Sequence, residues 1–209
     1  MCEVDVKNAH PSILLGILEQ LAEDTAWTNE VFERQFGAIR HYVDNRAAVL
    51  SCIQAAFGVD KKAAKAFFKS ATYGQSSHTW ARKFVSPEAR LCAPENAWKI
   101  LRSYQRAIKL ATTTINSEYG FLAEVARRNR KTKANSVLFH ILSSFEATHM
   151  LELATFVQAE GGISTAALVH DALFLEGGSQ QIKEIVGRYQ EATARTKIGR
   201  RLLHECSVI

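Results

Sequence analysis

Two aspartates, far apart in the chain, have the setting for metal-dependent chemistry. Asp171 follows His170 between two apolar runs within residues 164–176, a pattern typical of a strand, a tight turn and a second strand. An ionisable pair at such a tip is costly to bury unless it is paired or binds a metal, although a tip that simply faces water is the alternative. Asp5 lies where an alternating segment hands over to a helix, so it can face a cleft. Together, two carboxylates can hold a pair of Mg²⁺ ions, or Mn²⁺ in their place.

A second candidate site is a stripe of lysines on one predicted helix. Lys61, Lys65 and Lys69 recur every four residues, so they share one face, and Tyr73 continues it. Like charges on one stripe repel each other unless an anion lies against them. The stripe therefore predicts phosphate binding, with a solvated basic face as the alternative.

A third candidate is the basic run at residues 127–133, which contains Arg127, Arg128, Arg130 and Lys131. Such a run is often only a solvated loop, but it also suits a nucleic-acid backbone, because each phosphate contact releases counterions. The chain has no GxxxxGK[ST] segment, which argues against a P-loop site. The histidines of the apolar helix at 134–159 have no partner at ligand spacing, so we expect them in the core or in a groove.

Composition limits the class of protein. With 209 residues, 47% of them apolar, the chain can bury a sizeable core as one domain or as one domain with an inserted lobe. A net charge of +5 favours a polyanionic partner. The four cysteines are far apart, unlike those of a zinc site or a disulfide framework. Without a long apolar segment or a signal sequence, we expect a soluble intracellular protein, in the cytoplasm, an organelle or a virus-infected cell, with no membrane contact.

The elements that must position these residues follow from the spacing of apolar residues. Strands are expected at residues 1–7, on both sides of the 170–171 turn and at 201–209, with a further short strand at 121–126. The predicted helices follow Asn8, run from Thr28 to Gly58 with a break near Gly37, and cover 60–74, 95–119, 134–159 and roughly 179–195. A loop is expected between Pro87 and Pro94.

In order and spacing, these segments resemble the palm and fingers of family A DNA polymerases, the DNA polymerase I type. Asp5-Val-Lys-Asn-Ala-His-Pro-Ser-Ile resembles motif A, with a tail closer to the family B wording. Lys61-x3-Lys65-x7-Tyr73-Gly74 resembles motif B, with Lys61 where arginine is usual. Leu168-Val-His-Asp171, followed by Ala-Leu-Phe-Leu-Glu-Gly, resembles motif C. The stretch between them resembles the family's Arg-rich segment and the Arg-x3-Asn that opens the next helix, here Lys131-x3-Asn135.

The resemblance implies a fold of the α/β (α+β) class: a helix-rich polymerase palm with a small antiparallel sheet and an inserted helical fingers lobe. Residues 1–25 and 134–209 would form the palm, and residues 26–133 the fingers-like region. The metal ligands would be Asp5, Asp171 and the backbone of Val6. The nucleotide would contact Lys61, Lys65, Lys69, Tyr73 and His10. The primer–template would contact Gly74, Arg127, Arg128, Arg130, Lys131, Asn135 and His170.

Three positions depart from the family pattern. Ala172 stands where motif C normally has glutamate; phage-type single-subunit RNA polymerases also have a small residue there. His10 replaces a sugar-discriminating glutamate, and its bulk favours dNTPs. Lys69 replaces a residue that stacks at the nucleotide. Because motif A begins at Asp5, we expect no thumb within the chain, and poor processivity unless a separate chain supplies that grip.

The expected function is template-directed nucleotidyl transfer, foremost by a DNA-directed DNA polymerase that adds dNTPs to a primer 3′-OH by a two-metal mechanism. Its expected partners are a primer–template nucleic acid and dNTPs. The alternatives are an RNA polymerase or a polymerase with relaxed sugar choice, a non-catalytic nucleic-acid-binding palm that needs a partner subunit, and a two-metal nuclease. The lysine stripe argues against the nuclease, because hydrolysis needs no triphosphate contacts.

Overall fold

In the computed structural model, the described residues are 1–121, 124, 134–169 and 172–208. They divide into two units, one made of Met1–Thr25 and Ile141–Ile209 and the other of Ala26–His140. The sequence-predicted boundaries lie at 25/26 and 133/134, whereas the second observed division falls inside a helix, between His140 and Ile141. The naming of these units as palm and fingers stays a prediction.

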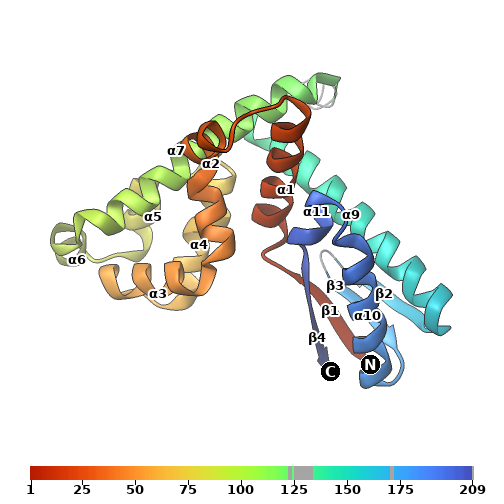
Figure 1. The fold of residues 1–209 in the computed structure, drawn as a ribbon. Helices are drawn as coiled ribbons and strands as arrows, with labels where there is room; N and C mark the ends of the chain where they lie inside the picture. The colour runs from red at the N-terminus through yellow and green to blue at the C-terminus, as the bar shows by residue number, and fades with distance from the viewer. Residues whose placement is uncertain (122–123, 125–133, 170–171, 209) are drawn as a thin grey trace. The chain divides into compact units, whose positions relative to one another are not determined.

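The first unit is built around a four-stranded antiparallel sheet. Its strands are β1 (Cys2–Lys7), β2 (Ser164–Val169), β3 (Ala172–Glu176) and β4 (Leu203–Val208), in the order β2-β3-β1-β4. Figure 1 shows the two chain ends lying together on this sheet, since the first and last strands are neighbours. The strand from the start of the chain is therefore central and pairs with strands from its far end.

Helices cover one face of the sheet and leave the other less buried. Along β1, Cys2, Val4 and Val6 are buried, whereas the alternate residues are half-buried or exposed. The helices of this unit are α1 (Ala9–Asp24), α10 (Ser179–Thr193), α11 (Lys197–Arg201) and most of α9 (Ala134–Gly161), and Figure 1 shows α9 and α10 alongside the strands. We call the opposite face, which carries Glu3, Asp5 and Lys7 on β1, the open face.

Close packing joins α1 to α11. A Cβ atom on Gly16 would lie 2.6 Å from the Cα of Ile198, so only glycine lets the two backbones approach this closely. Arg201 adds a two-point ion pair, because its Nε and Nη2 donate to the carboxylate of Glu19 at 3.1 and 2.6 Å. The helix that follows Asp5 is thus tied to the element that leads into β4.

The second unit is helical and has an aromatic core. It contains α2 (Asn29–Asp44), α3 (Arg46–Phe57), α4 (Lys61–Thr72), α5 (Ser77–Phe84), α6 (Pro87–Cys92) and α7 (Glu95–Glu118). The rings of Tyr42 and Phe68 stack with centroids 3.9 Å apart, and Tyr104 meets Phe68 edge-on at 5.0 Å. Fully buried Trp80 donates its Nε1–H to the carbonyl of Ala63 at 2.8 Å, so α5 is fixed to α4.

The helix-rich α+β class is confirmed, but several details of the sequence-based prediction are wrong. Gly37 does not break its helix; α2 continues to Asp44, and the chain turns at Asn45, whose φ of −118° is not helical. Residues 87–92 form a short helix rather than a loop, because Ser86 caps it by accepting from the backbone N–H of Ala89.

Two further segments also differ from the prediction. Phe121 and Glu124 are helical instead of extended, and α11 was not predicted at all. Among the residues described, no helix is long and apolar enough to cross a membrane. All four cysteines are free thiols.

Candidate active site

Asp5 lies at the centre of the open face. In the antiparallel pairing, Asp5 is opposite Ala172 on β3 and opposite Glu205 on β4. Residues directly opposite one another in such a sheet point to the same side, with Cβ atoms about 5 Å apart. A row of side chains therefore runs from Glu205 through Asp5 to Ala172, with its single small member on β3.

The neighbours of this row add further charges. Lys7 is two residues beyond Asp5 on β1, so it lies on the same face, and its Nζ forms an ion pair with Oε1 of Glu205. The two side chains are 44% and 53% exposed. Glu3 lies two residues before Asp5, opposite Phe174 and Ser207. The open face thus carries three carboxylates and one ammonium group within three rows.

The second predicted catalytic residue, Asp171, and its neighbour His170 lie outside the described residues. The register nevertheless places Ala172, the residue that follows Asp171 in the sequence, directly opposite Asp5. The half-buried Asp5 carboxylate is a hard oxygen donor of the kind that Mg²⁺ prefers, so this part of the predicted site fits that ion. Within the described part of the chain, no group of three or more metal-ligating side chains is assembled. Val6, expected to contribute its backbone, pairs with His204 on β4.

His10 is held by a carboxylate that sequence reasoning missed. Asn8 adopts the left-handed conformation, φ 57°, which turns the chain from β1 into α1 and places His10 in the first turn. The Nε2 atom of His10 lies 3.1 Å from Oε2 of Glu146 on α9, and both side chains are 15% exposed. The proposed contact of His10 with a nucleotide sugar stays a prediction, now with a defined orientation of the ring.

The lysine stripe forms as predicted on α4. Lys61, Lys65 and Lys69 are all exposed, while the opposite face of the helix buries Phe67 and Phe68 in the aromatic core. Among the described residues, no carboxylate forms an ion pair with any of these three lysines. Asp60 caps the helix by accepting from the backbone N–H of Ala63 at 2.6 Å. The stripe is therefore a fixed row of positive charge.

Tyr73 and Gly74 follow directly on the stripe. Tyr73 ends α4 and its ring meets Phe139 edge-on, with centroids 5.5 Å apart, while Phe139 itself is 44% exposed. Gly74 has a φ of +87°, a conformation that favours glycine, and the chain reverses there. The other predicted contacts Arg127, Arg128, Arg130 and Lys131 lie outside the described residues, and Asn135 is described only as part of the α9 backbone.

A buried polar cluster supports the covered face of the sheet. The Nε2 atoms of His149 on α9 and His204 on β4 are 2.9 Å apart, and the hydroxyl of Tyr189 on α10 lies 3.2 Å from Nδ1 of His149. Burial lowers the pKa of His149 to about 4, and burial together with the neighbouring His149 lowers the pKa of His204 to about 4. Both imidazoles are therefore neutral at pH 7 and act as packing groups, in line with the core position expected of His149.

Comparison with solved structures identifies the type of fold. The chain is similar to the POL domain of Pol1 from M. smegmatis, solved as a complex with DNA primer-template and dNTP, with a TM-score of 0.55 and 13% sequence identity. The match covers 99% of this chain and 38% of that one. The chain therefore has a polymerase-like α+β fold. No protein-family model matches the sequence. No curated protein matches it either.

The open face contains residues that sequence reasoning missed, namely Lys7 and Glu205. Lys7 stands two residues after Asp5, so its place on the same face follows from strand alternation. Glu205 alternates with buried or half-buried residues along β4. Only the register between the first and last strands shows that it lies opposite Asp5.

Proposed function

We propose that the chain is a template-directed nucleotidyltransferase, foremost a DNA polymerase that adds dNTPs to a primer 3′-OH. The observation that carries this proposal is the register of β1 and β3, which sets Asp5 opposite the residue that follows Asp171, on a polymerase-like fold. The similar solved chain was captured with a DNA primer-template and dNTP, which supports the same ligands for this chain.

Asp5 and Asp171, with the backbone of Val6, would hold two Mg²⁺ ions, for which Mn²⁺ can substitute. When bound, such ions supply activation of the attacking oxygen and charge stabilisation at the leaving pyrophosphate. The chain's own contribution is to hold the Asp5 carboxylate on the central strand of a sheet, whose covered face is packed by helices. A rigid strand is a more precise support for a reacting group than a loop is.

The lysine stripe would bind the triphosphate. Lys61, Lys65 and Lys69 present three ammonium groups along one side of α4, next to a helix N-terminus that itself favours anions. Binding there orients the nucleotide and neutralises its negative charge, which is most of what phosphoryl transfer asks of a protein. Tyr73 and Gly74, at the end of the same helix, would contact the new base pair.

Primer extension tests the proposal directly. We expect the wild-type chain, with Mg²⁺ and a primed DNA template, to add template-matched dNTPs in preference to rNTPs. Asp5→Asn and Asp171→Asn should each abolish addition while leaving thermal unfolding and primer–template binding unchanged, because Asn keeps the shape but removes the charge. Template-independent addition, or addition that survives in both variants, would contradict the proposal.

Two other functions keep specific support. Ala172 places a small, apolar side chain beside Asp5, as in the phage-type RNA polymerases, so rNTP addition in the same assay would select an RNA polymerase or a polymerase with relaxed sugar choice. The chain spans only 38% of the similar solved chain, which favours a nucleic-acid-binding palm that needs a separate subunit. Tight primer–template binding without any addition would select that function.

A further inference from the structure

Lys7 poses an electrostatic problem for a cation site at Asp5. The two residues are i and i+2 on β1, so their side chains leave the same face of the sheet with Cα atoms about 7 Å apart. A lysine side chain is long enough to bring its ammonium group to a carboxylate at that distance. An ammonium ion there would pair with Asp5 and repel a divalent cation.

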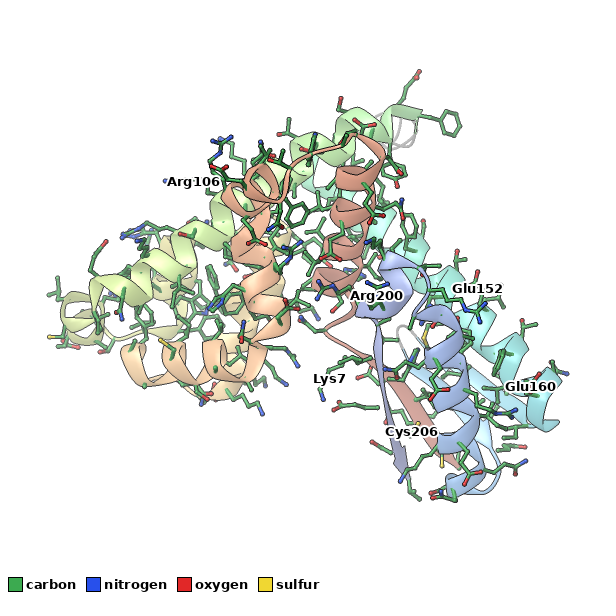
Figure 2. The ribbon with its side chains drawn as sticks, in the orientation of Figure 1. Lys7, Arg106, Glu152, Glu160, Arg200 and Cys206 are labelled. Atoms are coloured by element: carbon green, nitrogen blue, oxygen red, sulfur yellow. The ribbon has the colours of Figure 1, made fainter. Side chains whose placement is uncertain are left out.

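Glu205 occupies the position that resolves this problem. It lies directly opposite Asp5 and diagonally across from Lys7, whose direct partner on β4 is Leu203. The ion pair that the structure gives to Lys7 is with Oε1 of Glu205. Figure 2 shows the labelled Lys7 side chain leaving β1 on the side away from α9 and α10, which is the open face.

We infer that Glu205 is a positioning residue that draws Lys7 away from Asp5 and so keeps the Asp5 carboxylate available to a divalent cation. This inference rests on the proposed function, because it assigns the cation to the same site. Ala172, on the other side of Asp5, cannot hold Lys7, since its side chain has no charge. The β4 strand therefore contributes a functional side chain without itself touching the substrate.

A double-mutant cycle separates this role from the simple charge of Glu205. The variants are Glu205→Gln, Lys7→Met and the two combined, with Glu3→Gln as the matched control, since Glu3 is on the same face of β1 but does not face Lys7 across the sheet. The first readout is Mn²⁺ binding to the full chain, measured from the free-ion signal in electron paramagnetic resonance. The second readout is primer extension.

We expect Glu205→Gln to weaken Mn²⁺ binding about two- to fivefold, the range of one partly exposed ion pair. In the Lys7→Met background, the same substitution should have no effect, because the competing ammonium group is gone. Primer extension should fall and recover in parallel, and Glu3→Gln should resemble the wild type. Thermal unfolding of each variant checks that the sheet is intact.

Two outcomes would overturn the inference. If Glu205→Gln weakens Mn²⁺ binding equally in both backgrounds, Glu205 acts through its own charge or as a ligand. If it has no effect in either background, Lys7 does not compete for Asp5. Failure of the proposed function looks different, because the wild type would then bind no Mn²⁺ at this face and extend no primer.

Discussion

Lys61 and Lys62 lie in the first turn of α4, where the positive end of a helix disfavours cations, and no acidic residue accompanies them there. Each misplaced charge costs about 0.3–1 kcal/mol. Asp60 offsets part of this cost as the N-cap. A charge that destabilises its own helix is typical of a residue retained for binding, and a triphosphate is the anion that the rest of the site suggests.

Replacing one lysine of the stripe tests this interpretation. We expect Lys65→Ala to raise the KM for dNTP about tenfold or more, the effect of losing one charged hydrogen bond to a phosphate. Lys62→Ala is the matched control, because Lys62 is exposed on the same helix but lies off the stripe. Steady-state single-nucleotide incorporation measures both. If Lys65→Ala weakened only duplex binding and left the KM unchanged, the assignment of α4 to the triphosphate would be lost.

At the scale of elements, β1 connects the two faces of the sheet. Its odd-numbered residues Glu3, Asp5 and Lys7 face the candidate site, and its even-numbered residues face the helices. On the helix side, Val6 is opposite His204, which contacts His149 of α9. The position of Asp5 therefore depends on how well α9 and α10 pack against the strands.

The buried histidine pair makes this packing sensitive to pH. In the folded chain the pKa of both imidazoles is lowered to about 4, whereas the unfolded chain keeps the ordinary value near 6.5. Between these values the unfolded state binds more protons, so the free energy of unfolding falls as the pH falls from about 6.5 to 4. We expect a loss on the order of 1–3 kcal/mol across this window, measured by urea unfolding.

A variant distinguishes the pair from the other titrating groups. His204→Gln removes one imidazole and should flatten the pH dependence between 4 and 6.5, even though it lowers stability at pH 7. His78→Gln, an exposed position in the helical unit, should leave the slope unchanged. An equal slope in wild type and His204→Gln would show that the burial of the pair does not control acid sensitivity.

For the whole molecule, the sequence predicts what depends on local pattern. The lysine stripe, the 164–176 hairpin and the strongly periodic helices follow from apolar spacing, and all are present. The break of the long helical stretch was placed at Gly37, because glycine is a common breaker, but Gly37 is accommodated within α2 and the turn falls at Asn45. Propensity is a weak guide where tertiary packing decides.

What the sequence could not supply is pairing between distant segments. The Asp5–Glu205 register joins the first strand to the last, and the His10–Glu146 contact joins residues 136 positions apart. Neither partner has a neighbouring motif that marks it, because a lone glutamate on a strand or helix is most often a solvated surface residue. The candidate site was therefore predicted through its aspartates and lysines, while the residues that position them were found only in the fold.

The size and charge of the chain set how it should hold nucleic acid. Its match spans 38% of the similar polymerase chain, and its net charge is +5, so we expect the 209-residue chain alone to bind primer–template mainly through phosphate contacts. Such binding weakens steeply with salt, because released counterions must be recaptured. Extension should then be distributive, with a few nucleotides added per binding event and fewer as salt rises from about 50 to 200 mM.

A trap assay measures this directly. The chain is bound to labelled primer–template, and dNTPs are added together with an excess of heparin, so that each product reports a single binding event. The same reaction without heparin is the control, and there repeated rebinding should give longer products from the same enzyme. Long products in the presence of heparin at about 200 mM salt would show that the chain grips its template by itself, because phosphate contacts alone are too weak at that ionic strength. In that case no separate subunit is needed, and the proposal of a partner chain would be wrong.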